Sequence, residues 1–148
     1  MSQIATKNKT SFRWGFMKMH RVALNGDPFL TRLQIIQTPW FAVLLTRIDQ
    51  PDAPVAPHDH SRSFTSWIIS GGYTEDVYLN ISNLDSFTRV ERKRWSWHVM
   101  PQRWAHSLVK VDKPLWTLVL AGKQENKDWH FWTWEGKIPY HQYPGWYQ

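Results

Sequence analysis

Short apolar runs, rich in β-branched and aromatic residues and separated by turn formers, make up most of the chain. The turn formers include "QPDAPVAP", "GG", "SNLD" and "DKP". None of the runs has the spacing of an amphipathic helix. The pattern therefore predicts an antiparallel all-β sandwich or barrel, with any helix short and near residues 27–32. The predicted strands cover residues 33–36, 40–48, 64–70, 73–81, 87–91, 95–100, 105–111 and 115–121.

The length of 148 residues fits one domain that buries a sizeable core without disulfides. Residues 1–12, rich in Lys, Thr, Ser and Asn, predict a flexible N-terminal arm, which leaves 13–148 for the barrel and an aromatic C-terminal segment. Because there is no cysteine, no thiolate serves as a ligand or nucleophile. No signal-peptide pattern and no bilayer-spanning apolar run occurs, so we expect a cytoplasmic protein without a membrane partner.

The net charge of +6 favours anionic partners, although the excess of Lys and Arg could equally solubilise an aromatic-rich domain. Basic residues are scattered apart from a cluster at 91–95, and no groove-reading helix is predicted, so duplex nucleic acid is not the expected partner. Most of the eleven tryptophans are expected in the core. The aromatic tail at 128–148 is expected either to close one side of the core or to form a wall beside a pocket.

The stretch "PHDHSRSF" holds two histidines, His58 and His60, with one residue between them. In a strand, this spacing directs both imidazoles to one face and Asp59 to the other. Two converging imidazoles suit a metal ion, whereas solvated histidines in a turn are the alternative interpretation. A third ligand is available at His106, which begins a strand after the turn at "PQRW". His98 precedes that turn and could face outward.

These two stretches resemble the paired motifs of the cupin superfamily, whose fold is a double-stranded β-helix, a barrel of jelly-roll type. The first motif, H-x-H followed by Glu and Gly, is matched by His58, His60 and Gly72; the second, P-x-G-x-x-H, is matched by Pro101 and His106. The resemblance spans residues 40–121 and implies an all-β, single-domain cupin fold.

A narrower resemblance is to small cupin-like proteins of bacteriophages and actinobacteria. It is carried by the segments "QTPWFAVLLTRI", "HDHSRSF", "GGYTE" and "DWHFWTWEGKIPYHQY". It implies that a phage-encoded chain of this kind would work in the host cytoplasm.

Two departures from the cupin motifs shape the expected metal site. Thr65 stands where the first motif has its Glu, and Arg103 stands where the second has its Gly. The ligands that remain are His58, His60 and His106. Such a three-His set resembles that of thiol dioxygenases, and also the neutral-ligand zinc site that acidifies bound water. We expect a divalent ion, Fe²⁺ first, with Zn²⁺, Ni²⁺ and Mn²⁺ as alternatives.

Further residues near the motifs are candidates for catalysis or ligand binding. Glu75 follows the "GG" turn as a substitute carboxylate or proton handler, and Asp59 is expected to support the ligands from behind or to lie on the surface. Arg103 is the other catalytic candidate, because a guanidinium at a pocket mouth binds carboxylate or phosphate. The ligand-pocket candidates, for which core packing or a solvated surface is the alternative, are Arg62, Thr65, Trp67, Arg94, Trp97 and Trp104.

Two functions remain open on this evidence. The first is a metal-dependent enzyme, a dioxygenase-like oxidoreductase or an isomerase, that acts on a small anionic or polar molecule. The second is a non-catalytic protein that binds or sequesters a small nucleotide-like ligand, as a phage accessory factor would. A homodimer is compatible with both.

Overall fold

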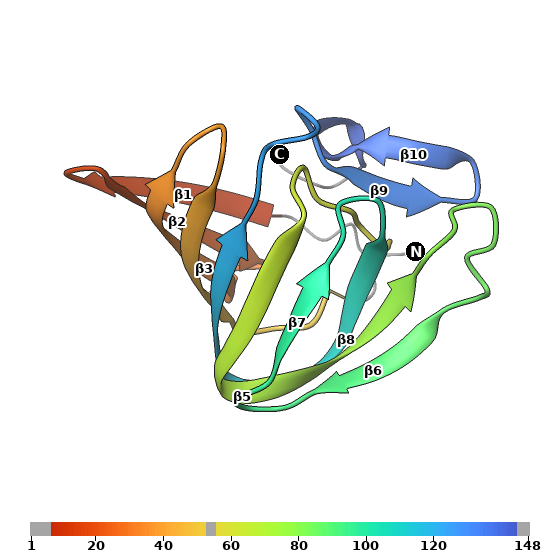
Figure 1. Cartoon of the computed structure of the whole chain (residues 1–148), viewed down its shortest axis with the longest axis horizontal. Helices are drawn as coiled ribbons and strands as arrows, with labels where there is room; N and C mark the ends of the chain where they lie inside the picture. The colour runs from red at the N-terminus through yellow and green to blue at the C-terminus, as the bar shows by residue number, and fades with distance from the viewer. Residues whose placement is uncertain (1–6, 53–55, 145–148) are drawn as a thin grey trace.

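The computed structural model describes residues 7–52 and 56–144 (Figure 1). Most of these residues lie in antiparallel strands, and the one helical segment among them is the short 3₁₀ turn η1 (Tyr140–Gln142). Hydrogen-bonded strands follow the order β1-β2-β3-β4-β8-β5-β6, with β7 paired to β5 and with β9 and β10 as a hairpin. The strands are β1 (Lys7–Trp14), β2 (Met17–Leu24), β3 (Asp27–Gln37), β4 (Ala42–Ile48), β5 (Phe64–Tyr78), β6 (Thr88–Arg92), β7 (Trp97–Met100), β8 (Ala105–Ala121), β9 (His130–Thr133) and β10 (Gly136–Pro139).

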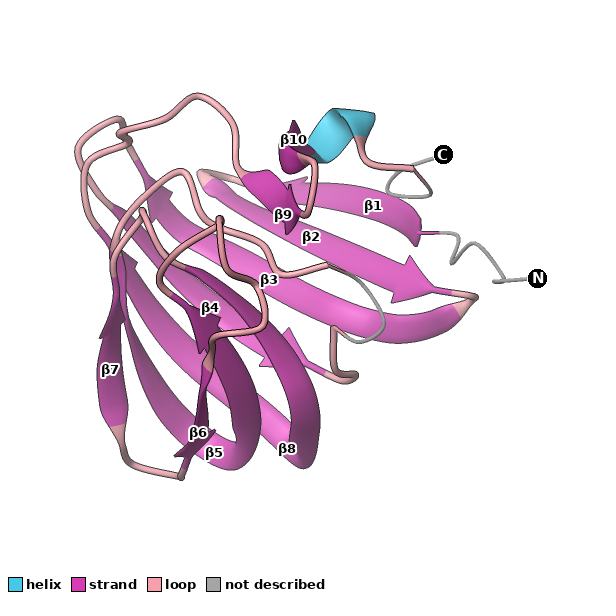
Figure 2. Ribbon diagram, turned by 90° about the vertical axis from the view of Figure 1, so that its right-hand side faces the viewer, coloured by secondary structure: helices cyan, strands magenta, loops and turns pink. Residues whose placement is uncertain are grey.

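The two longest strands, β5 and β8, pair with each other along most of their length. Since β8 also pairs with β4, and β5 also pairs with β6 and β7, these two strands connect all parts of the main sheet. Figure 2 shows β1, β2 and β3 on one side of the molecule and β5, β6 and β7 on the other. This arrangement confirms the predicted antiparallel all-β architecture.

The predicted runs at 64–70 and 73–81 form one strand, β5, because the chain bends at Gly71 instead of turning back. The φ angle of Gly71 is +69°, and a Cβ at this position would overlap the carbonyl oxygen of Asp112 and lie 2.6 Å from that of Pro114. The register of β5 against β8 shifts on both sides of Ser70. Only glycine combines this backbone conformation with so close an approach of the neighbouring strand.

The short helix expected near residues 27–32 is wrong, because this segment begins β3. Asn25 and Gly26 have φ angles of +53° and +85°, the conformation of a two-residue hairpin turn, and Leu24 pairs directly with Asp27. Such a turn matches the twist of the flanking strands and leads the chain straight from β2 into β3. Pairing with β2 and β4 on both sides then holds β3 extended.

The flexible arm predicted for residues 1–12 is wrong over residues 7–12, which belong to β1. Eight consecutive residues of β1 pair with β2, from Lys7 with Leu24 to Trp14 with Met17. Backbone pairing has therefore outweighed the polar composition of the segment. The remainder of the predicted arm, residues 1–6, lies outside the described residues.

Buried side chains form two hydrophobic clusters along β5 and β8. One consists of Ile68, Tyr73, Leu108 and Leu115, and the other joins Tyr78 and Ala105 to Trp132 of β9. The second cluster shows how the aromatic tail closes one side of the core. The described part of the chain holds no helix with the length and hydropathy of a membrane span.

Replacing Gly71 by alanine should destabilise the fold strongly, because the new methyl group meets backbone atoms of β8 in addition to the cost of a positive φ. We expect Gly71→Ala to lower the free energy of unfolding by about 3 kcal/mol or more. Gly15→Ala is the matched control, since its φ is +58° but a Cβ there has nothing within 4 Å; it should cost about 1–2 kcal/mol. Equal urea midpoints for the two variants would contradict the role assigned to the β5–β8 contact.

Candidate metal centre

The three histidines that the sequence groups together, His58, His60 and His106, lie side by side. Their ring centroids are 4.8–5.1 Å apart, and the Nε2 atoms of His60 and His106 are 3.0 Å apart. One nitrogen from each ring lies within 4.8 Å of those of the other two. Across residues 7–52 and 56–144, this is the one group of three or more His, Asp or Glu residues spaced to hold a metal ion.

Backbone pairing brings these distant histidines together. The main-chain N–H groups of His58 and His106 each donate to the other residue's carbonyl, both at 3.0 Å. His106 is the second residue of β8, so this pairing attaches the segment 57–60 to the end of the longest strand. The segment is not the strand that the spacing of His58 and His60 suggested, because β5 begins only at Phe64 and His58 forms isolated β-bridges alone.

Asp59 turns away from the imidazoles, as the alternation predicts, but it is buried and not on the surface. Its carboxylate has no exposed area and accepts hydrogen bonds from the His130 N–H (2.7 Å) and the Trp132 indole N–H (3.1 Å). The Lys137 ammonium lies 3.5 Å from its second oxygen. Asp59 thus anchors the β9–β10 hairpin to the histidine segment.

Glu75 lies behind His106 and is fully buried. Its Oε2 is 2.5 Å from Nδ1 of His106, and its Oε1 accepts a 2.7 Å hydrogen bond from Arg92. Burial alone would raise the pKa of Glu75, but the hydrogen bond and charge of His106, with those of Arg92, lower it to about 2. The His106 ring donates from Nδ1 to this carboxylate, and in its neutral form it would then present the Nε2 lone pair to the site. Glu75 therefore orients the His106 ring, whereas the sequence offered it as a substitute carboxylate or a proton handler.

His98 faces inward, in contrast with the outward orientation considered from the sequence. It is buried on β7, with Nε2 3.1 Å from the Tyr73 hydroxyl and 3.9 Å from Glu75 Oε1. Burial lowers the pKa of His98 to about 4, with help from the Arg92 charge. The imidazole is therefore neutral at pH 7 and belongs to the buried polar network behind the three histidines.

A cavity of about 350 Å³ opens beside the cluster, with His58 and His60 in its wall. Its aromatic lining includes Trp129 and Tyr140, whose rings stack at 4.9 Å and 8°. The aromatic tail therefore meets both expectations, because Phe131 and Trp132 are buried in the core while Trp129 and Tyr140 line the cavity. The part of the tail at 145–148 lies outside the described residues.

The sequence analysis missed the polar wall of this cavity, which comes from the N-terminal strands. Lys9, His20, Arg32 and Gln34 all line it. Two signals could have found them: the Asn25-Gly26 hairpin turn, and the alternate spacing of residues on the two flanking strands. Treating residues 1–12 as an arm and 27–32 as helical removed both signals.

Of the residues predicted for the ligand pocket, the structure places only Arg62 in the cavity wall. Its guanidinium donates to the carbonyl of Thr38 (2.6 Å) and to that of Gly122 (2.8 Å), so it ties two loops together. These hydrogen bonds occupy guanidinium N–H groups of Arg62 that were expected to hold an anion. Arg103, the predicted catalytic arginine, is exposed in the turn before β8 and is outside the cavity lining.

Two other pocket candidates, Thr65 and Trp67, lie outside the cavity because their side chains are on the opposite face of β5. Phe64 lines the cavity and Ser66 is buried, so Thr65 and the 45% exposed Trp67 belong to the opposite face. The partner of Trp67 on β7 is Trp97, which is 69% exposed. The two remaining candidates, Arg94 and Trp104, are likewise absent from the lining; the Arg94 guanidinium lies 4.9 Å from the ring centre of Trp95.

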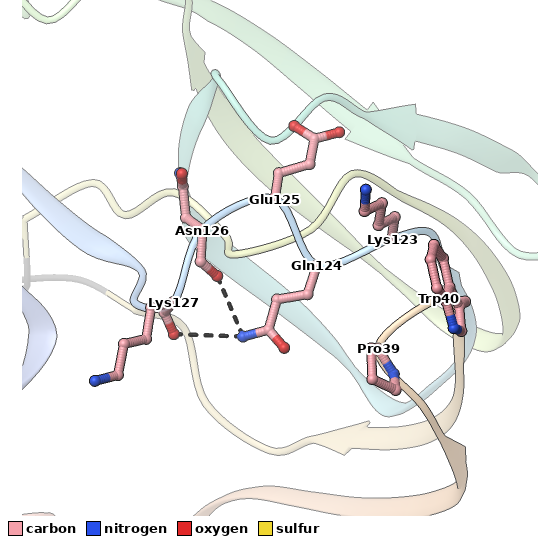
Figure 3. Close-up of a pocket in the computed structure, with 7 residues that line it drawn as sticks. All are labelled: Pro39, Trp40, Lys123, Gln124, Glu125, Asn126 and Lys127. Carbon is pink, nitrogen blue, oxygen red and sulfur yellow. Dashed lines mark hydrogen bonds between the residues drawn. The ribbon is translucent and has the colours of Figure 1, made fainter.

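A second hollow on the surface lacks the features of a metal centre (Figure 3). It is lined by Pro39, Trp40 and the loop 123–127, without a histidine. The Gln124 amide donates to the carbonyls of Asn126 and Lys127 within the loop (Figure 3). The chemistry of the protein is therefore sought at the histidine cluster.

Comparison with solved structures identifies proteins of similar fold. A protein provisionally assigned as a mannose-6-phosphate isomerase from Ralstonia eutropha JMP134 superposes with a TM-score of 0.55 at 13% identity, over 66% of this chain and 88% of that one. The iron(II) form of HppE gives a TM-score of 0.52 at 11% identity, over 82% of this chain and 58% of that one. A scan of protein-family models gave no match, and neither did a search of curated proteins.

Both similar proteins are cupin-fold proteins, and at these identities the likeness concerns the fold alone. It agrees with the antiparallel strand order described above and with the position of the histidines at one end of the barrel. The chain has the cupin fold, a double-stranded β-helix of jelly-roll type.

Proposed function

We propose that this protein is a metal-binding cupin that acts on a small anionic or polar molecule, with His58, His60 and His106 as the metal ligands. The observation that carries the proposal is the convergence of three ring nitrogens, all within 4.8 Å of one another, beside a cavity of about 350 Å³ whose wall includes His58 and His60. A cavity of this size suits one small molecule.

The residues present fit a divalent metal ion. Burial lowers the pKa of His60 well below its usual range, and the charges of His106 and Arg32 lower it further, so its ring is neutral and its lone pair is available at pH 7. Glu75 selects the tautomer of His106. When all three imidazoles are unprotonated, they suit Fe²⁺, our first choice, and also Zn²⁺, Ni²⁺ or Mn²⁺. Such an ion, when bound, supplies Lewis acidity and coordination positions that are open to a substrate.

Residues of this chain would hold the substrate and control protons around it. The aromatic lining, which includes Trp129 and Tyr140, replaces water with apolar surface on one side of the cavity. Glu75 stays ionised and keeps a proton on Nδ1 of His106. Because the three ligands carry no negative charge, a bound ion would leave the site cationic and attractive to anions. We therefore place the activity among dioxygenase-like or isomerase-like reactions of anionic or polar molecules.

The second candidate function is a protein that binds a nucleotide-like ligand without catalysis, in keeping with the resemblance to small cupin-like proteins of bacteriophages and actinobacteria. The observation that favours it is the stacked pair Trp129 and Tyr140 in the cavity wall. Aromatic faces at a cavity stack on bases of any sequence.

Loss of the ligands should remove the metal. Protein purified without a metal-affinity tag is expected to contain about one divalent ion per chain by elemental analysis, and the His58→Ala/His60→Ala/His106→Ala variant none. His141→Ala is the control, because His141 is exposed on η1 and should keep the metal. Glu75→Gln should weaken metal affinity about 10–100-fold, since His106 loses its orienting carboxylate. Stoichiometric metal in the triple variant would contradict the assignment.

The stability of the metal-free protein should fall with falling pH. The folded pKa of His98, about 4, and that of Glu75, about 2, both lie below the ordinary values of 6.5 and 4.5. The unfolded chain therefore binds more protons between each pair of values, and stability is lost as pH drops through those windows. We expect the titration of His98 to lower the free energy of unfolding by about 3 kcal/mol as the pH falls from 6.5 to 4. Urea unfolding at each pH measures this loss. If His98→Gln lost stability in parallel with the wild type there, this origin would be wrong.

Two probes separate the enzyme from the binding protein. If the metal has an open position, azide should change the visible spectrum of the Co²⁺-substituted protein. Adenosine monophosphate should then bind the metal-loaded protein about tenfold more tightly than the metal-free triple-histidine variant, because part of its binding free energy comes from the metal. Calorimetry that shows the same nucleotide affinity in both proteins, with an unchanged azide spectrum, would instead favour the sequestering protein.

A further inference from the structure

One face of the β1–β2–β3 sheet forms a cationic wall of the cavity. Lys9, His20, Arg32 and Gln34 line the cavity, and their registers explain why they share this face. His20 pairs with Arg32 across β2 and β3, while Lys9 pairs with Val22, two residues along β2 from His20. Because side chains two residues apart lie on one face of a strand, all four point to the cavity side.

The cations of this wall are close enough to perturb one another. Burial lowers the pKa of Lys9, and the charges of Lys18 and Arg32 lower it further. Burial and the Lys9 charge likewise lower the pKa of His20, while a hydrogen bond with the Gln34 side chain raises it. Like charges gathered on a concave surface repel, and an anion bound among them would relieve that repulsion.

The arrangement also contains oriented hydrogen-bonding groups. Nδ1 of His20 lies 2.9 Å from the Ser11 hydroxyl, and the ring also forms a hydrogen bond with the Gln34 side chain. His20 is only 8% exposed, so these two contacts fix the orientation of its imidazole. Among the described residues that line the cavity, the one carboxylate is Asp52, which accepts the Leu108 N–H at 2.9 Å. The wall of β1, β2 and β3 therefore presents donors and positive charge with no acidic side chain of its own.

We propose that Lys9, His20, Arg32 and Gln34 form a subsite for the phosphate or carboxylate group of a small molecule. The anion subsite itself needs no metal. That the same molecule reaches the histidine cluster, of which His58 and His60 line this cavity, rests on the proposed function. Arg32 supplies a guanidinium fork for two oxygens, Lys9 adds charge at the exposed edge, and Gln34 and His20 complete the contacts.

Inorganic phosphate and acetate are the probes, titrated by calorimetry into the metal-free triple-histidine variant and into the metal-loaded wild type. Phosphate should bind both. In the metal-free background, Arg32→Gln should weaken phosphate binding about tenfold and Lys9→Gln about threefold, and high salt should weaken it in every protein. Lys9 is exposed, so its variant should fold even if Arg32→Gln is destabilised. A weaker but parallel pattern with acetate would identify carboxylates as the second group accepted.

Arg21→Gln is the matched control, because Arg21 is exposed and pairs with Thr31 on the opposite face of the same strands. Arg21→Gln removes one positive charge, as Lys9→Gln and Arg32→Gln do, and should leave the phosphate affinity within about twofold of the parent protein. Equal losses in Arg21→Gln and Lys9→Gln, or phosphate binding that needs the metal and ignores Lys9 and Arg32, would overturn the subsite. Failure of metal retention with phosphate binding intact would instead overturn the proposed function and leave the subsite standing.

Discussion

The pairing of β5 with β8 is the constraint on which the rest of the structure depends. It aligns Val77 with His106 and Glu75 with Leu108, so the buried carboxylate comes to lie behind a histidine at the end of the barrel. The bend at Gly71 lets both strands curve and still pair, and β4, β6 and β7 add to their free edges. Without this register, His106 would have neither its backbone partner nor its orienting carboxylate.

Two fully buried carboxylates support the histidine cluster from different directions. Asp59 receives N–H donors from β9, and Glu75 receives donors from β6 and β8. Burying an ionised carboxylate is costly unless hydrogen bonds and opposite charges compensate for the lost hydration, and both groups have them. The cluster is thereby held in one arrangement by groups that themselves stay out of the cavity, which leaves the cavity walls to select the ligand.

The sequence predicted most strands between residues 40 and 121 and grouped the three histidines, because both follow from local rules, whereas β1, β2, β9 and β10 were not predicted. Alternation places His58 and His60 together, and the motif spacing brings in His106. The cavity lining was harder, since it depends on which face of each strand is inward. Thr65 and Trp67 were assigned to the inner face of β5, but neighbouring Phe64 and Ser66 hold it. The contribution of β1 was missed because a polar strand resembles a flexible arm until its partner strand is known, and that of Arg32 on β3 because residues 27–32 were expected to be helical.

The position of Asp59 determines how late in folding the site can form. Its partners lie 71 and 73 residues later in the chain, on β9, and the two bridge partners of His58 lie on β8 and β9. Every element around the cluster is thus joined by contacts of long sequence separation, which form late and slowly in folding. On the ribosome, the chain must have emerged beyond Trp132 before the histidine segment is clamped. The cluster therefore reaches its clamped arrangement only after β9 has been synthesised.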